Sequence, residues 1–252
     1  MTHPAEVDYV LAVALPDAGP QLEGLEAEPI SFGDSQEAVV VGAQVAEFSP
    51  QVPAGQRAAL TDCLLLAQLA ANKATASRPD LLAWYRTYVE VLQGMGWTVQ
   101  TMSMEERQLG DLDAGVHNAV IPVITAMLGP VGAAASMVVS VLNGLQEMNR
   151  DSPWITVFDR ASQHSSGAKF QFGFVDVGPD PSSVSIKLLA LAIDARRTIT
   201  QVLFFKFSRQ DAKLRTADGR LGIDGARLES IKDAVAARVQ PFLADNISRI
   251  EI

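Results

Sequence analysis

The pattern of apolar and polar positions changes several times along this chain and divides it into segments of different predicted structure. Residues 1–53 contain six prolines, which separate short apolar runs such as DYVLAVAL and AVVVGAQV. These runs predict isolated strands within a loop-rich arm. From residue 54 to 94 the apolar positions recur at helical spacing, which predicts two amphipathic helices. Residues 97–104 alternate between apolar and polar side chains and predict one strand.

The most informative segment is residues 114–146, which contain no Asp, Glu, Lys or Arg. A helix of roughly 20 apolar residues matches the thickness of a bilayer core. This run therefore predicts either a hairpin of two short buried helices or a segment that enters lipid. We predict a lipid-seeking face made of Ile121, Ile124, Leu128, Val131, Val138 and Leu142. Small residues every four positions predict a helix-contact face made of Gly132, Ser136, Ser140 and Gly144.

The composition changes again after Arg150, because seven of the ten Phe residues lie between Phe158 and Phe207. Residues 170–174, 184–188 and 203–207 alternate as strands do, and the short connections between them favour an antiparallel sheet. Asp218-Gly219 predicts a further small hairpin. Asp224 is a good N-cap for a last helix, whose stripe of Leu228, Ile231, Val235 and Val239 would cover the sheet.

We therefore predict an α+β fold, in which a helical half with a buried apolar helical hairpin is joined to a carboxy-terminal antiparallel β-sheet covered by one helix. The predicted divisions are the acidic, proline-rich arm with short strands at 1–53, the helical region at 54–150, and the sheet with its helix at 151–252. We expect the last two regions to form one compact domain, since the chain is of single-domain length.

Charge adds a constraint on partners. Residues 1–56 hold nine acidic residues and no Lys or Arg, whereas the remaining residues are balanced. An acidic arm cannot neutralise phosphates, so we expect no nucleic-acid partner. Anionic lipid would repel the arm, and a membrane role therefore requires that the arm is turned away.

Cys63 is the single cysteine, so no intrachain disulfide is expected, and its apolar neighbours predict a buried thiol. Residues 1–20 have no basic segment before their apolar stretch, and no secretory signal is apparent. The default location is the cytoplasm, and export without a cleaved signal is the alternative.

Motifs for chemistry are few. His3, His117 and His164 lie far apart, which argues against a zinc site, and Asp111 and Asp113 match only the start of a calcium loop. Glycine-rich nucleotide loops and the Gly-x-Ser-x-Gly nucleophile pattern are absent. We expect no cofactor and no metal. The segment RASQHSSGA, with Ser162, His164, Ser165 and Ser166, leaves a hydrolase-type enzyme as one alternative.

These observations favour a non-enzymatic membrane-active protein, a soluble precursor of the pore-forming or toxin-like kind whose uncharged hairpin inserts in lipid. The expected partners are a lipid membrane and further copies of the chain. The alternative is a soluble protein-binding or structural module, with a protein partner that the sequence does not identify, in which the hairpin is only core.

Overall fold

A computed structural model describes residues 4–18, 30–76, 80–103, 115–164, 167–178, 180, 182–195, 199, 201–206 and 212–250. Its helices are α1 Pro4–Ala12, α2 Ala54–Ala74, α3 Leu81–Gly94, α4 Val116–Ala135, α5 Met137–Gly144, α6 Pro153–Ser162, α7 Gly225–Val239 and α8 Leu243–Asn246. Two short 3-10 helices cover Leu145–Glu147 and Gln240–Phe242. The strands are β1 Glu37–Val41, β2 Gln44–Phe48, β3 Thr98–Ser103, β4 Gln163–His164, β5 Gly167–Val177, β6 Ser183–Ala195, β7 Ala212–Asp224 and β8 Ile247–Arg249.

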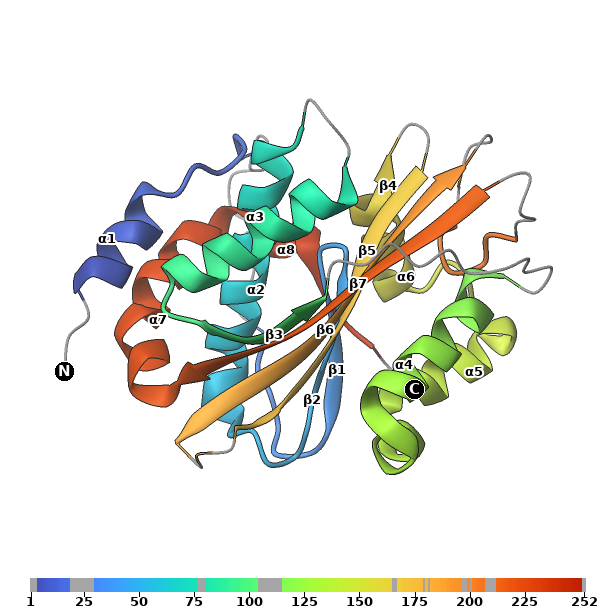
Figure 1. The fold of residues 1–252 in the computed structure, drawn as a ribbon, viewed down its shortest axis with the longest axis horizontal. Coiled ribbons are helices and arrows are strands. Elements are labelled where there is room, and N and C mark those ends of the chain that lie inside the picture. The colour runs from blue at the N-terminus through green and yellow to red at the C-terminus, as the bar shows by residue number, and fades with distance from the viewer. Residues whose placement is uncertain are drawn as a thin grey trace.

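A mixed β-sheet forms the centre of the molecule (Figure 1). Its strand order is β3-β7-β6-β5-β2-β1-β8, and β4 pairs with β5. The pairings are antiparallel except that of β2 with β5, which is parallel. The long strands β5, β6 and β7 carry apolar side chains on both faces, as strands covered on both sides do.

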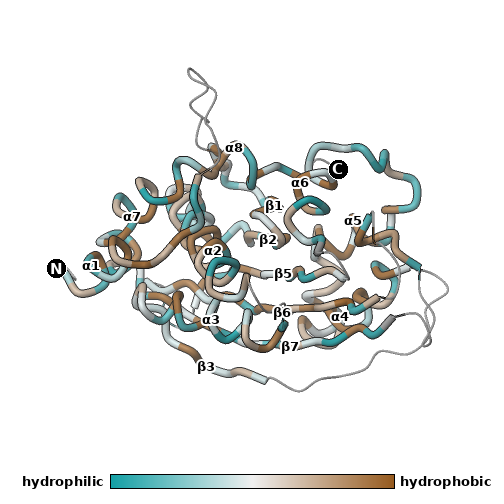
Figure 2. The backbone as a smooth tube through the Cα atoms, turned by 90° about the horizontal axis from the view of Figure 1, so that it is seen from above, coloured by the Kyte–Doolittle hydropathy of each residue, from teal (hydrophilic) through white to brown (hydrophobic). Residues whose placement is uncertain are grey.

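Helices cover the two faces of this sheet and give three layers (Figure 2). On one face α1, α2, α3 and α7 enclose the first part of the core, together with Ile186, Leu188 and Ala190 of β6. On the other face α4, α5 and α6 pack over Phe170 and Phe172 of β5 and over the alternate residues of β6. Burial of these two apolar sets is the main term that stabilises the fold.

The fold is α+β, as the sequence predicts. The two predicted helices at 54–94, the strand at 97–104, the apolar helical hairpin and the antiparallel carboxy-terminal strands are all present. Asp224 caps α7 by accepting hydrogen bonds from the N–H groups of Ala226 and Arg227, and the predicted stripe of α7 is buried. The prediction of isolated strands in the acidic arm is wrong, because β1 and β2 pair with each other and are inner strands of the sheet.

Some local predictions are wrong at the amino terminus, because tertiary packing overrides local preference. The run DYVLAVAL belongs mostly to helix α1 rather than to a strand. Val10 is fully buried against the α2, α3 and α7 layer, and a Cβ at Gly94 would clash with the ring of Tyr9. The helix thus forms because its apolar side has a place to pack.

Other wrong predictions lie after Arg150. The first element there is the helix α6, in which Trp154, Ile155 and Phe158 pack into the core at helical spacing. Residues 201–204 form turns instead of a strand, and Phe207 lies outside the described residues. Asp218-Gly219 lies inside β7, opposite Leu189 and Leu188, so it makes no hairpin.

Candidate functional site

The uncharged run forms α4 and α5 on the α6 side of the sheet (Figure 1). Helix α4 is bent at Gly129, which has a φ of 78° that only glycine adopts readily. Pro130 follows, and a residue before proline is also disfavoured in the helical region. The long helix is therefore two pieces, 116–128 and 130–135.

Helix α4 is exposed to an unusual degree for its composition. Among the described residues it is the one helix long and apolar enough to cross a membrane. Only 22% of its most apolar window is buried inside the protein. From Thr125 to Ala135 a single residue, Ala133, is buried. Val131 is 85% exposed. An ordinary core helix would hide most of such a surface.

The sheet beneath α4 explains this exposure. Lys187 of β6 and Asp218 and Arg220 of β7 lie on the face that α4 covers, on the same side as the buried Leu189 and Leu191. The apolar side chains of α4 gain little by packing against charged side chains. Helix α4 consequently does not pack closely against the strands here.

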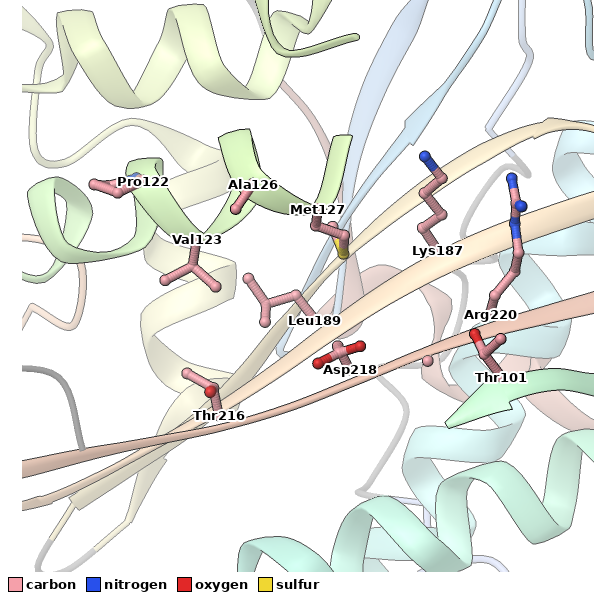
Figure 3. A pocket seen from close by; sticks show the side chains of 11 residues that line it. Thr101, Pro122, Val123, Ala126, Met127, Lys187, Leu189, Thr216, Asp218 and Arg220 are labelled. Atoms are coloured by element: carbon pink, nitrogen blue, oxygen red, sulfur yellow. The ribbon is translucent and has the colours of Figure 1, made fainter. Parts of the chain in front are cut away.

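A cavity of about 660 Å³ lies between α4 and the strands (Figure 3), and we call it the α4 cavity. Helix α4 contributes Pro122, Val123, Ala126 and Met127 to its wall. The strand side contributes Thr101, Lys187, Leu189, Thr216, Asp218 and Arg220. The site therefore has one apolar wall and one polar wall.

The start of α4 is held by polar contacts to residues 203–205. The backbone N–H groups of Val116 and His117 donate to the carbonyl oxygens of Phe205 and Leu203, at 3.0 and 3.1 Å. The buried His117 ring lies 2.8 Å from the same Leu203 oxygen, through Nδ1. Since a carbonyl oxygen only accepts, Nδ1 carries the proton. Gly115 has a φ of 96°, and a Cβ there would crowd the His117 ring at 3.0 Å.

Asp159 of α6 steadies that contact segment. Its carboxylate accepts a hydrogen bond of 2.8 Å from the N–H of Val202. Burial raises the pKa of Asp159 to about 6, and the Val202 hydrogen bond opposes the rise.

The joint between α4 and α5 is held by Glu47, which projects from β2 and is 6% exposed. Its carboxylate accepts hydrogen bonds from the Ser136 hydroxyl at 2.7 Å and from the N–H groups of Val138 and Met137 at 3.0 and 3.2 Å. A carboxylate is well placed at a helix N-terminus, where unpaired N–H groups and the helix dipole favour negative charge. Gln36 adds a hydrogen bond to the Ala135 carbonyl oxygen at 2.9 Å and another to Glu47. We call these contacts the Glu47 clasp.

The six residues of the predicted lipid-seeking face have different environments. Ile124, Val138 and Leu142 are buried in the core, Ile121 and Leu128 are half-buried against it, and Val131 is exposed. Of the predicted helix-contact face, Ser136 is the buried N-cap of α5, whose side chain accepts a hydrogen bond from Val139 N–H. Gly132 and Ser140 are exposed, and Gly144 has open space around its α-carbon. The hairpin thus has some apolar side chains packed in the core and others exposed to solvent, and its two helices meet at the N-cap of α5.

The other chemical candidates do not gather into a site in the described structure. Ser162 ends α6 and is buried, and His164 lies in β4, whereas Ser165, Ser166, Asp111 and Asp113 lie outside the described residues. No group of three or more His, Cys, Asp or Glu side chains within the described ranges is arranged to hold a metal ion. Burial raises the pKa of the Cys63 thiol well above its usual range, which favours an unreactive thiol.

Sequence reasoning missed the residues that hold the hairpin and line its cavity, namely Glu47, His117, Lys187 and Arg220. One signal was present: Glu47 shares the inward face of its strand with Val45, and an acid on such a face needs a partner. The others become notable only once β6 and β7 are paired.

Comparisons with known proteins give likeness in structure alone. No protein-family model matches the sequence, and no curated protein matches it significantly. The chain is similar to a solved structure described as a delta-endotoxin, with a TM-score of 0.41 and 15% identity, over 83% of this chain and 89% of that one. It is also similar to the activated Cyt2Ba monomer from Bacillus thuringiensis subsp. israelensis, with a TM-score of 0.41 and 13% identity, over 72% of this chain and 96% of that one. Both likenesses concern the arrangement of helices and strands.

Proposed function

We propose that this protein is a non-enzymatic membrane-active protein, a soluble precursor of the pore-forming or toxin-like kind, whose α4–α5 hairpin leaves the sheet and enters a lipid bilayer. Oligomerisation of the inserted form is part of this proposal, because one hairpin of this length cannot line a pore.

The observation that carries the proposal is the exposure of an uncharged helix. Helix α4 has no Asp, Glu, Lys or Arg, and 22% of its most apolar window is buried. A soluble protein gains little by leaving such a surface in water, whereas lipid would remove it from water entirely. Twenty helical residues straightened into one helix span about 30 Å, which matches a bilayer core.

The attachment of the hairpin is consistent with release. Its polar contacts are concentrated at two places, the start of α4 and the Glu47 clasp, and the α4 cavity lies between helix and sheet. Helix α1, which carries Glu6 and Asp8 of the acidic arm, packs on the opposite side of the sheet (Figure 1). These two acids therefore do not stand between the hairpin and an anionic membrane.

The test is release of a trapped dye from liposomes of neutral and anionic composition, with circular dichroism recorded before and after. The key variant is Val131→Asp, because Val131 is 85% exposed and its replacement leaves the soluble core intact. The matched control is Leu11→Asp, which makes the same kind of change at a residue of α1 that is 55% exposed. A charge within a membrane helix costs on the order of 2.5–3.5 kcal/mol at the centre and less toward the ends, so we expect Val131→Asp to lower leakage about tenfold or more.

The expected result is leakage by the wild type and by Leu11→Asp, and its loss in Val131→Asp at unchanged thermal stability. Absence of leakage and of lipid binding in every composition would overturn the proposal and leave the hairpin as part of a soluble binding module. Leakage by Val131→Asp equal to that of the wild type would exclude α4 as the inserting element.

A further inference from the structure

The polar wall of the α4 cavity contains two cations that lie directly opposite each other in the sheet. Lys187 and Arg220 are directly opposite in the antiparallel pairing of β6 and β7. Like charges in this position repel, because directly opposed Cβ atoms lie about 5 Å apart. Neither side chain has a hydrogen-bond or ion-pair partner among the described residues. Figure 3 shows the two side chains next to each other on the side of the sheet where α4 lies.

The charges around this pair favour an anion of modest charge. Asp218 also lines the α4 cavity, so the groups Lys187, Arg220 and Asp218 leave one net positive charge there. Both cations also line a second cavity of about 370 Å³, in which Glu47 and Asp176 already accept hydrogen bonds from other groups. The two cavities share these cations, and the excess of positive charge holds for the described lining of the α4 cavity taken by itself.

The opposite wall determines what kind of anion fits. Pro122, Val123, Ala126 and Met127 of α4 present hydrocarbon to the same cavity, and Leu189 lies beneath them. A small inorganic anion would leave this wall in contact with water. An amphiphile with a singly charged head would pair its head with the two cations and place its chain along α4. A volume of about 660 Å³ lies within the range of small-molecule sites.

We infer that the α4 cavity binds an anionic phospholipid, with the phosphodiester of the headgroup between Lys187 and Arg220 and an acyl chain against the apolar wall of α4. This inference rests on the proposed membrane activity and names the class of lipid that it uses. A lipid bound here would lie between α4 and the strands, and it would place the hairpin beside the bilayer from which the lipid came.

The binding test uses the full chain and dihexanoyl phosphatidylglycerol below the concentration at which it forms micelles, followed by calorimetric titration. Dihexanoyl phosphatidylcholine supplies the same chains without net charge, and inorganic phosphate supplies the anion without chains. The variants are Lys187→Gln and Arg220→Gln. The matched control is Lys213→Gln, an exposed lysine of β7 that lies opposite Asp194 and away from the cavity.

We expect phosphatidylglycerol to bind about tenfold more tightly than either phosphatidylcholine or phosphate, since a charge-assisted pair adds roughly that much. Each cavity variant should weaken binding about tenfold, and Lys213→Gln should not. Both cavity variants should keep the melting temperature of the wild type or exceed it, because the repulsion is removed. Ala126→Phe, which fills the cavity and leaves the charges in place, should also weaken binding.

Equal binding of the two lipids, binding of phosphate as tight as that of lipid, or an equal effect of Lys213→Gln would overturn the inference. This test is separate from that of the proposed function, because a short-chain lipid offers no bilayer to enter. Leakage that requires Val131 but is indifferent to Lys187→Gln and to lipid charge would support the function and reject this site. Charge-dependent binding without leakage would support the site and reject the function.

Discussion

Glu47 is the residue on which the position of α5 depends most. Its carboxylate accepts hydrogen bonds from Ser136, Met137 and Val138 in a nearly dry environment, where such bonds are stronger than in water. Replacing it with glutamine keeps the shape and turns one acceptor into a donor that faces N–H groups. We expect Glu47→Gln to lower the free energy of unfolding by about 2 kcal/mol, measured by denaturant titration.

The same substitution tests whether the Glu47 clasp only stabilises the fold or also restrains the hairpin from leaving the sheet. If the Glu47 clasp restrains the hairpin, Glu47→Gln should increase dye release although it weakens the protein. The control is Glu37→Gln on the neighbouring strand, because Glu37 pairs with Arg57 and Arg249 instead of the hairpin. Stability should fall in both variants, and dye release should rise only in Glu47→Gln. An equal rise in both would mean that general destabilisation is responsible.

Asp62 of α2 gives the stability a pH dependence that can be assigned to one side chain. Burial raises the pKa of Asp62 to about 7, from an ordinary value of 3.8. A raised pKa in the folded state contributes stability that is complete below the unfolded pKa and is lost as the pH rises through the folded pKa. Between pH 4.5 and pH 7.5 the wild type should lose on the order of 2 kcal/mol through this group.

Asp62→Asn should flatten this part of the profile when the free energy of unfolding is measured across that pH range. A smaller slope should persist, because the pKa of Asp159 is also raised, to about 6. A variant whose profile is parallel to that of the wild type would show that Asp62 is solvated in the folded protein.

At the scale of the element, α4 is a long apolar helix that a bend at Gly129 divides into two shorter pieces. Gly129 has a φ of 78°, and a Cβ there would have open space, so the cost of a substitution comes from the backbone alone. Gly129→Ala should therefore destabilise the soluble form by about 1–3 kcal/mol. It should also favour continuous helix in lipid, since alanine is the better helix former.

We expect Gly129→Ala to show a lower melting temperature in solution and more helix by circular dichroism when liposomes are added. Gly132→Ala serves as the comparison, because it is the same exchange three residues away at a glycine whose φ is not positive. Its added Cβ would lie 3.3 Å from the Cβ of Leu128. If both variants behave alike, straightening of the bend is not part of membrane entry.

At the scale of the whole molecule, the two helical layers are held with different strength. The layer of α2 and α3 is deeply buried, with Trp84, Tyr85 and Tyr88 all in the core. The layer of α4 and α5 lies partly over charged strands and a cavity. Segments with few buried contacts open at lower free energy than the global transition.

Native-state hydrogen exchange should therefore show the amides of α4 and α5 exchanging together, well before those of α2 and the centres of β5, β6 and β7. Exchange of both layers only through global unfolding would mean that the hairpin does not open by itself.

The sequence by itself determined the elements whose periodicity is long and whose partners are local. The helices at 54–94, the cap at Asp224 with its stripe, and the absence of charge in 114–146 follow from spacing alone. Predictions for short segments were wrong where tertiary packing determines the structure. Tyr9 and Val10 lie in a helix because that helix packs against the α2, α3 and α7 layer. Asp218-Gly219 is turn-like in sequence but pairs with β6 across its whole length.

Only the tertiary structure decided what the uncharged run meets. Glu47 lies 91 positions from Val138, and Lys187 becomes the neighbour of Arg220 only when β6 and β7 pair. Hydrophobic periodicity indicates which side chains avoid water, but it does not tell which distant surface receives them. Here that surface is partly charged. The sequence alone left open whether the hairpin is buried or enters lipid, and only the fold shows that much of α4 is exposed above a cavity.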